Sequence, residues 1–66
     1  MKTKKKPTKE LQPGDKVVWG DGDVVDVDHV LEVEKGETIL KVHVQRPCGK
    51  SFFYAGIDSV QNVKEE

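Results

Sequence analysis

The sequence lacks the cysteine pairs that would cross-link a small fold. Its 66 residues include one cysteine, Cys48, so we expect neither a disulfide framework nor a cysteine-based zinc site. The chain also lacks any apolar run of the roughly eighteen residues that a membrane-spanning helix requires. The lysines at its start are followed by no apolar segment, so we expect no signal peptide and a cytoplasmic location.

Motifs that carry catalysis are lacking as well. No glycine-rich phosphate loop opens a helix pattern, and no serine lies on a nucleophile elbow. His29 and His43 are predicted to point to opposite faces of a sheet, whereas a zinc ion needs several convergent ligands. We therefore predict a protein that is not an enzyme, with no catalytic residues, no metal site and no cofactor.

The chain is short, which limits what it can build. Sixty-six residues make one domain, which buries only roughly 60% of the surface that its unfolded form exposes. A deep catalytic cleft would weaken so small a core, and a homodimer would supplement it. What the sequence does contain is alternation of apolar and polar residues, which indicates β-strands.

The longest alternating segment covers residues 23–34 and predicts a strand with one buried face. Its apolar face holds the odd-numbered positions, which include His29. A strand of this length is expected to be irregular, and we place a bend or a β-bulge near His29 and Val30. Residues 38–45 form the return strand, joined to the first through a two-residue tip at residues 35–36.

Three shorter strands, a helical turn and two loose ends complete the predicted fold. The shorter strands are expected at residues 16–19, 51–54 and 60–63. The helical turn falls at residues 57–60, before the last strand. Residues 1–10 are polar and without periodicity, which predicts a disordered arm, and residues 64–66 are expected to fray. The predicted fold is all-β: one small barrel of five strands over residues 11–63.

Two stretches resemble a known fold. LQPGDKVVW at residues 11–19 resembles the first strand of Tudor-, KOW- and SH3-like barrels, and FFYAGIDSVQNV at residues 52–63 resembles their closing strand, helical turn and last strand. The resemblance covers residues 11–63 and implies an SH3-like small barrel that works as a binding module. The loop after Trp19 is acidic, where nucleic-acid-binding members usually carry bases, which argues against nucleic-acid binding by the barrel itself.

Acidic residues cluster along and beside the long strand. Four of them occupy its even-numbered positions, so alternation puts them on one face with a spacing of ~6.6 Å. A rigid row of negative charge imitates a nucleic-acid backbone and suits a basic partner protein. The alternative is a solvated face that keeps the protein soluble and blunts edge pairing. The predicted partner-binding residues are Asp21, Asp23, Asp26, Asp28, Glu32, Glu34 and Glu37.

The charge distribution is uneven, because a lysine-rich start precedes a body with nine acids against five lysine and arginine residues over positions 11–63. In size and charge layout the chain is similar to small bacteriophage host-takeover proteins, some of which block bacterial histone-like HU proteins by occupying their DNA-binding surface. That resemblance implies a nucleic-acid-mimicking inhibitor in a host cytoplasm. No motif carries it, so it transfers no functional residues.

The lysine-rich arm supports a rival function. Lysines neutralise phosphates, so the chain is alternatively a nucleic-acid- or ribosome-associated module. The arm contains neither arginine nor aromatic residues and offers no base readout or stacking. Two other interpretations remain open: the arm only improves solubility, or it folds back on the acidic strand. The predicted nucleic-acid contacts are Lys2, Lys4, Lys5, Lys6 and Lys9.

A third hypothesis rests on the few aromatic residues. Alternation puts Phe52 and Tyr54 on one face of their strand and Phe53 on the other, so one of the two faces is expected to be partly exposed. An exposed pair fits a peptide-binding or structural adaptor, or the interface of a homodimer. The alternative is that all the aromatic residues complete the core.

Overall fold

The structure of the chain, a computed structural model, describes residues 2–21 and 24–65. Within these residues it consists of six antiparallel strands and one 3-10 helix, which confirms the predicted all-β class. The elements are β1 (Thr3–Pro7), η1 (Thr8–Glu10), β2 (Lys16–Asp21), β3 (Val24–Lys35), β4 (Ile39–Arg46), β5 (Gly49–Gly56) and β6 (Val60–Lys64).

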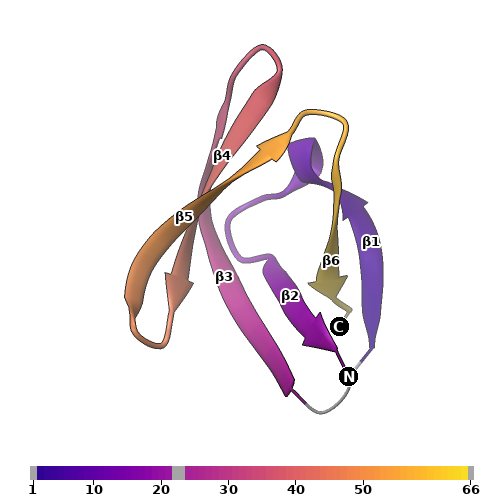
Figure 1. Ribbon diagram of the computed structural model, residues 1–66, viewed down its shortest axis with the longest axis vertical. Helices are drawn as coiled ribbons and strands as arrows, with labels where there is room; N and C mark the ends of the chain where they lie inside the picture. Colours follow the sequence, from indigo (N-terminus) through magenta and orange to yellow (C-terminus); the bar gives the residue numbers. More distant parts are fainter. Residues whose placement is uncertain (1, 22–23, 66) are drawn as a thin grey trace.

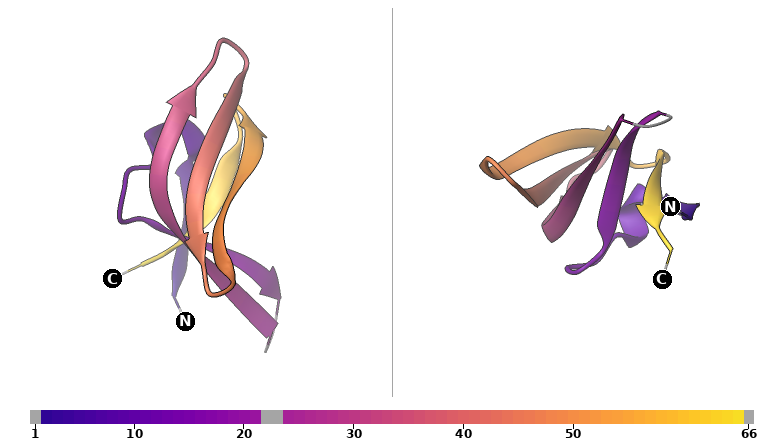
Figure 2. Two further views of the ribbon diagram at one scale, coloured as in Figure 1. Left: turned by 90° about the vertical axis from the view of Figure 1, so that its left-hand side faces the viewer. Right: turned by 90° about the horizontal axis from the view of Figure 1, so that it is seen from below.

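All six strands belong to one sheet in the order β1-β6-β2-β3-β4-β5 (Figure 1). The predicted count of five strands is therefore wrong by one. The sheet is open, because β1 and β5 are its two edges and no ladder joins them among the residues that the structure describes. The view from below in Figure 2 shows the sheet curling, with β4 and β5 at one side of the molecule and β6 and β1 at the other.

The additional strand is β1, which lies in the segment expected to be a disordered arm. Thr3–Pro7 pairs along its length with β6, from Thr3 opposite Lys64 to Pro7 opposite Val60. The pairing includes Lys64, and the Glu65 N–H donates to the Lys2 carbonyl, so these two tail residues are ordered rather than frayed. The prediction failed because backbone hydrogen bonds hold β1, and a run of lysines shows no apolar period.

The 3-10 helix is also not where the sequence predicted it. It follows β1 and packs on the connection before β6, where the Thr8 N–H donates to the Ser59 carbonyl and the two hydroxyl groups lie 2.7 Å apart. Thr8 is fully buried there. Residues 57–58 form a hydrogen-bonded turn instead of a helix, closed by the Ser59 N–H and hydroxyl donating to the Gly56 carbonyl.

The hairpin of β3 and β4 has a longer tip than predicted. Lys35 pairs with Leu40 and Val33 with Val42, so the register is displaced from the one that a two-residue loop would set. The Gly36 N–H donates to the Ile39 carbonyl and closes the tip. The displacement is by an even number of residues, so each side chain of β4 still points to its expected face.

A β-bulge interrupts β3 between Val30 and Glu32, close to the predicted position. Its consequence was not predicted: a bulge adds one unpaired residue, so the side chains before it change face. Val30 is buried, whereas His29 and Leu31, which were expected to point inward, are exposed. The core beneath the sheet is formed by Leu11, Val17, Val30, Val42, Val44 and Val63, with Val33 and Phe53 packed against it.

Candidate functional site

The bulge divides the predicted acidic row between the two faces of β3. Glu32 and Glu34, after the bulge, are exposed on the face away from the core. Asp28, before the bulge, points to the core side with Val30 and is only 2% exposed. Asp26 points to the same side, but it lies near the start of β3 and is exposed. The expectation that all four acids form one row is therefore wrong.

Asp28 is engaged within the molecule rather than free for a partner. Its Oδ2 atom accepts hydrogen bonds from Trp19 Nε1 at 2.8 Å and from Arg46 Nε at 3.1 Å, and the Arg46 Nη2 atom lies 3.1 Å away. A buried carboxylate must be paired with donors, and this one is satisfied by two other strands. Asp28 therefore contributes to the fold, and the sequence-based assignment to a docking row is corrected.

The remaining two predicted acids of the strand lie in an ordered surface that we call the outer face. Opposite them on β4 are Lys41 and His43, and beyond these on β5 are Tyr54 and Phe52. Cross-strand pairing makes two rows, one of Glu34, Lys41 and Tyr54 and one of Glu32, His43 and Phe52. The outer face is formed by Glu32, Glu34, Lys41, His43, Phe52 and Tyr54.

The aromatic residues of the outer face are exposed despite their size. Phe52 is 48% and Tyr54 58% exposed, and their rings meet edge to face with centroids 5.6 Å apart. Lys41 Nζ lies 4.3 Å from the centroid of the Phe52 ring, a cation–π distance. Ile39, which precedes Lys41 on the same side of β4, is 50% exposed and extends the apolar area. Of the two outcomes considered for Phe52 and Tyr54, the exposed pair is confirmed.

One ion pair orders the acidic side of the outer face. Glu34 Oε2 and His43 Nε2 lie 2.6 Å apart, in a contact that becomes a salt bridge when the imidazole is protonated. The hydrogen bond from His43 lowers the pKa of Glu34 below its usual value. His43 lies opposite Glu32 in the strand register, so Glu34 reaches it along the same face of β3.

Three predicted acids remain. Glu37 is exposed in the tip between β3 and β4. Asp21 ends β2, and its side chain lies outside the described part, as does Asp23 as a whole. Of the seven predicted partner-binding residues, the structure brings Glu32 and Glu34 together.

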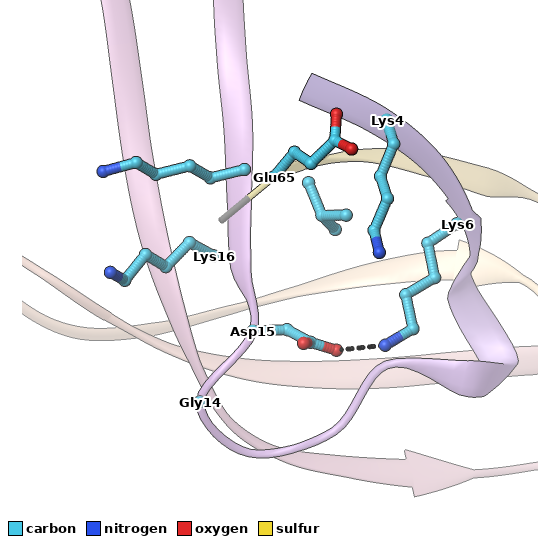
Figure 3. A pocket seen from close by; sticks show the side chains of 8 residues that line it. Lys4, Lys6, Gly14, Asp15, Lys16 and Glu65 are labelled. Atoms are coloured by element: carbon cyan, nitrogen blue, oxygen red, sulfur yellow. Dashed lines mark hydrogen bonds and ion pairs between the residues drawn. The ribbon is translucent and has the colours of Figure 1, made fainter. Parts of the chain in front are cut away.

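A second candidate site is a basic groove at the opposite edge of the sheet, drawn in Figure 3. Lys4 and Lys6, from the predicted lysine set, extend from β1 toward Asp15, whereas Lys16 extends away from them at the rim. Lys16 and Lys64, which sequence reasoning did not select, complete the basic lining. They escaped notice because β6 lies between β1 and β2 and joins them only through long-range pairing.

Asp15 partly neutralises this groove. Its Oδ2 atom accepts hydrogen bonds from Lys6 Nζ at 2.8 Å and from the Gln12 N–H at 2.9 Å. Burial raises the pKa of Asp15, but the Lys6 and Gln12 hydrogen bonds and the charges of Lys6 and Lys4 outweigh burial and bring the pKa below its usual value. The other predicted arm contacts, Lys2, Lys5 and Lys9, are exposed and do not line the groove.

No group of three metal-binding side chains converges anywhere in the described ranges 2–21 and 24–65. Within the same ranges, no helix has the length and apolar character needed to cross a membrane. Comparison of the chain with protein-family models, with curated proteins and with solved structures found no match. The candidate surfaces must therefore be judged on their own geometry.

Proposed function

We propose that the protein is a non-enzymatic binding module that docks its outer face on a basic protein partner. The observation that carries the proposal is the pair Phe52 and Tyr54, about half exposed, beside the carboxylates of Glu32 and Glu34. Large aromatic side chains left in water on a small soluble domain are typical of an interaction surface. This proposal combines the acidic-docking and aromatic-adaptor hypotheses, because Glu32 and Glu34 lie on the same face of the sheet as Phe52 and Tyr54.

The two kinds of side chain have different tasks in this docking. Buried aromatic anchors supply most of the affinity of an interface. The carboxylates, by charge complementarity, speed encounter and fix the orientation of a basic partner. The most specific form of the proposal is an inhibitor that competes with DNA for the basic surface of a histone-like DNA-binding protein.

The order of the strands supports a binding role of this kind. Without β1, the sheet runs β6-β2-β3-β4-β5, with the last strand beside the first, which is the order of an SH3-like small barrel. We assign the chain to this fold as part of the proposal, with β1 as an addition at the edge. Barrels of this type serve mainly as binding modules, and the function resides in the surface that each one carries.

Charge reversal on one strand tests the docking. We expect the doubly substituted Glu32→Lys, Glu34→Lys protein to bind a bacterial histone-like HU protein more than about tenfold more weakly than the native chain, by calorimetry. Asp26→Lys is the matched control, because it changes one charge of the same strand on the opposite face, and its affinity should stay within about twofold. Phe52→Ala with Tyr54→Ala should also weaken binding.

Three outcomes of these binding experiments would contradict the proposal. If the affinity loss per reversed charge were the same for Glu32 and Glu34 as for Asp26, net charge and not the outer face would govern binding. If a DNA duplex failed to compete with the protein for HU, nucleic-acid mimicry would be excluded. If HU did not bind at all, the histone-like form of the proposal would be wrong.

The basic groove favours a second candidate function, binding of a nucleic-acid backbone. Four lysines from β1, β2 and β6 line it, with Asp15 and Glu65 as the acids. Each phosphate contact contributes a salt-dependent increment of affinity. Deletion of the first nine residues is not a clean test of this function, because it would remove strand β1.

Substitution therefore replaces deletion as the test of the groove. Titration with a short DNA duplex should change the amide chemical shifts of β1 and β6 residues at about 50 mM salt, and these changes should be smaller at about 200 mM. Lys4→Ala with Lys16→Ala should abolish them, and Lys5→Ala with Lys9→Ala, outside the groove, should not. Equal loss in both double variants would mean contacts by net charge alone.

A further inference from the structure

The two edges of the sheet are protected very differently. β1 presents Lys4, Lys5 and Lys6 and ends at Pro7, which are the residues that natural proteins place on edges to prevent pairing with other chains. β5 carries one charged residue, Lys50, and no proline over its eight residues. It also displays two exposed aromatic side chains. An edge of this composition is adapted to pairing.

The hydrogen-bond pattern identifies which backbone groups of β5 are turned outward. The Ile57 N–H donates to the Thr38 carbonyl, in line with the register that pairs Gly56 with Ile39. In an antiparallel ladder, hydrogen-bonded residue pairs alternate with pairs that are not hydrogen-bonded. The backbone groups of the odd-numbered residues of β5 therefore form the hydrogen bonds to β4. The even-numbered residues, which include Phe52 and Tyr54, direct their N–H and C=O groups away from the sheet. β5 pairs with β4 alone in the described chain.

The β5 edge is complementary to a second copy of itself. An antiparallel register centred on Phe53 places Phe52 of one copy opposite Tyr54 of the other, twice, through their outward-facing backbone groups. Cross-strand aromatic pairs are among those that stabilise a sheet. The two-fold axis then stands perpendicular to the sheet, so both outer faces lie on the same side.

The charges at the ends of β5 agree with the same register. Lys50 lies near its start and Asp58 just after its end, and both are exposed. In the centred antiparallel register, Lys50 faces Gly56 of the second copy, with Asp58 of that copy two residues further on. A lysine side chain spans a diagonal separation of this kind. Opposite charges therefore meet at both ends of the strand pair.

We propose that the protein forms a homodimer in which β5 pairs antiparallel with β5 of a second copy, joining the two sheets into one. The dimer does not depend on the proposed function, because backbone edges and the Lys50 and Asp58 charges form it, although Phe52 and Tyr54 also belong to the outer face. It presents two outer faces side by side, which gives a partner with repeated basic sites two points of attachment.

Hydrogen exchange and mass together test the dimer. Sedimentation should show a concentration-dependent approach to twice the monomer mass. In the dimer the amides of Phe52 and Tyr54 become protected, whereas the amide of Phe53, bonded to β4, is protected at every concentration. Tyr54→Pro removes an outward N–H without breaking the ladder to β4, so it should leave a folded monomer. Tyr54→Ala, which keeps the N–H, should retain part of the dimerisation.

A charge exchange provides a second test that does not rely on proline being tolerated. Lys50→Glu or Asp58→Lys alone should weaken the dimer at least about threefold, and the two together should restore it. A chain that stays monomeric at the highest concentration reached, with fast-exchanging Phe52 and Tyr54 amides, would overturn the proposal. A dimer in which those two amides remain unprotected would overturn it too, since another surface would then form the interface.

Discussion

At the scale of single residues, Asp28 shows how a side chain with a functional appearance serves the fold. The sequence places it in the middle of an acidic alternation. In the structure it lies against the core and accepts hydrogen bonds from Trp19 and Arg46. These two residues come from β2 and the end of β4, so the carboxylate ties three adjacent strands together.

We expect Asp28→Ala to lower the free energy of unfolding by about 1–3 kcal/mol, because the Trp19 and Arg46 donors lose their common acceptor. Asp26→Ala, on the same strand and exposed, should change it by less than about 0.5 kcal/mol. Urea unfolding followed by Trp19 fluorescence measures both. Equal and small effects would show that the carboxylate does not anchor the three strands.

At the scale of the elements, β1 is held to the body by its backbone ladder with β6 and by one side-chain contact. Lys6 reaches from β1 to Asp15, which lies in the turn before β2 and also accepts the Gln12 N–H. The strand has no apolar face of its own, because its lysines are exposed or line the basic groove. The Lys6–Asp15 contact is therefore expected to control how firmly β1 is docked.

The lowered pKa of Asp15 gives this contact a pH dependence whose sign is fixed. A carboxyl group with a lower pKa in the folded state stabilises that state above its unfolded value, near 3.8, and the contribution is lost as the pH falls through the folded value. We expect the amide protection of the β1–β6 ladder to fall over this acidic range more than that of β3–β4.

Asp15→Asn is the matched control for the pH experiment, because it retains the shape of the side chain without the charge. Its β1–β6 protection should already be reduced at neutral pH and should lose most of its acid sensitivity. If native and substituted chains lost protection in parallel on acidification, other carboxyl groups would be responsible.

At the scale of the whole molecule, the open sheet separates three surfaces. The basic groove lies at the β1 edge, the aromatic strand β5 is the opposite edge, and the acids Glu32 and Glu34 lie on β3 toward the β5 side. The phosphate site lies apart from the other two surfaces, whereas the docking face and the dimer edge share Phe52 and Tyr54. Substitutions at Glu32 and Glu34 test the docking, and substitutions at Lys50 and Asp58 test the dimer, without touching the shared pair.

The sequence by itself determined the all-β class, the approximate place of five of the six strands and an irregularity in β3 near His29, and it left the exposure of Phe52 and Tyr54 as one of two alternatives. These features follow from period-two alternation and from turn residues, which are local signals. The acids Glu32 and Glu34 were correctly placed on an outer face because the bulge lies before them in the chain.

Tertiary structure decided the rest. The bulge reverses the faces of the β3 side chains that precede it. Whether Asp28 points inward or outward therefore depends on the pairing of β3 with β4 and not on the composition of β3. The lysine-rich start becomes a strand only because β6 offers an edge, almost the full length of the chain away. Pairing energies between distant segments are carried by backbone groups that every residue shares, and for that reason the identities of the residues do not reveal them.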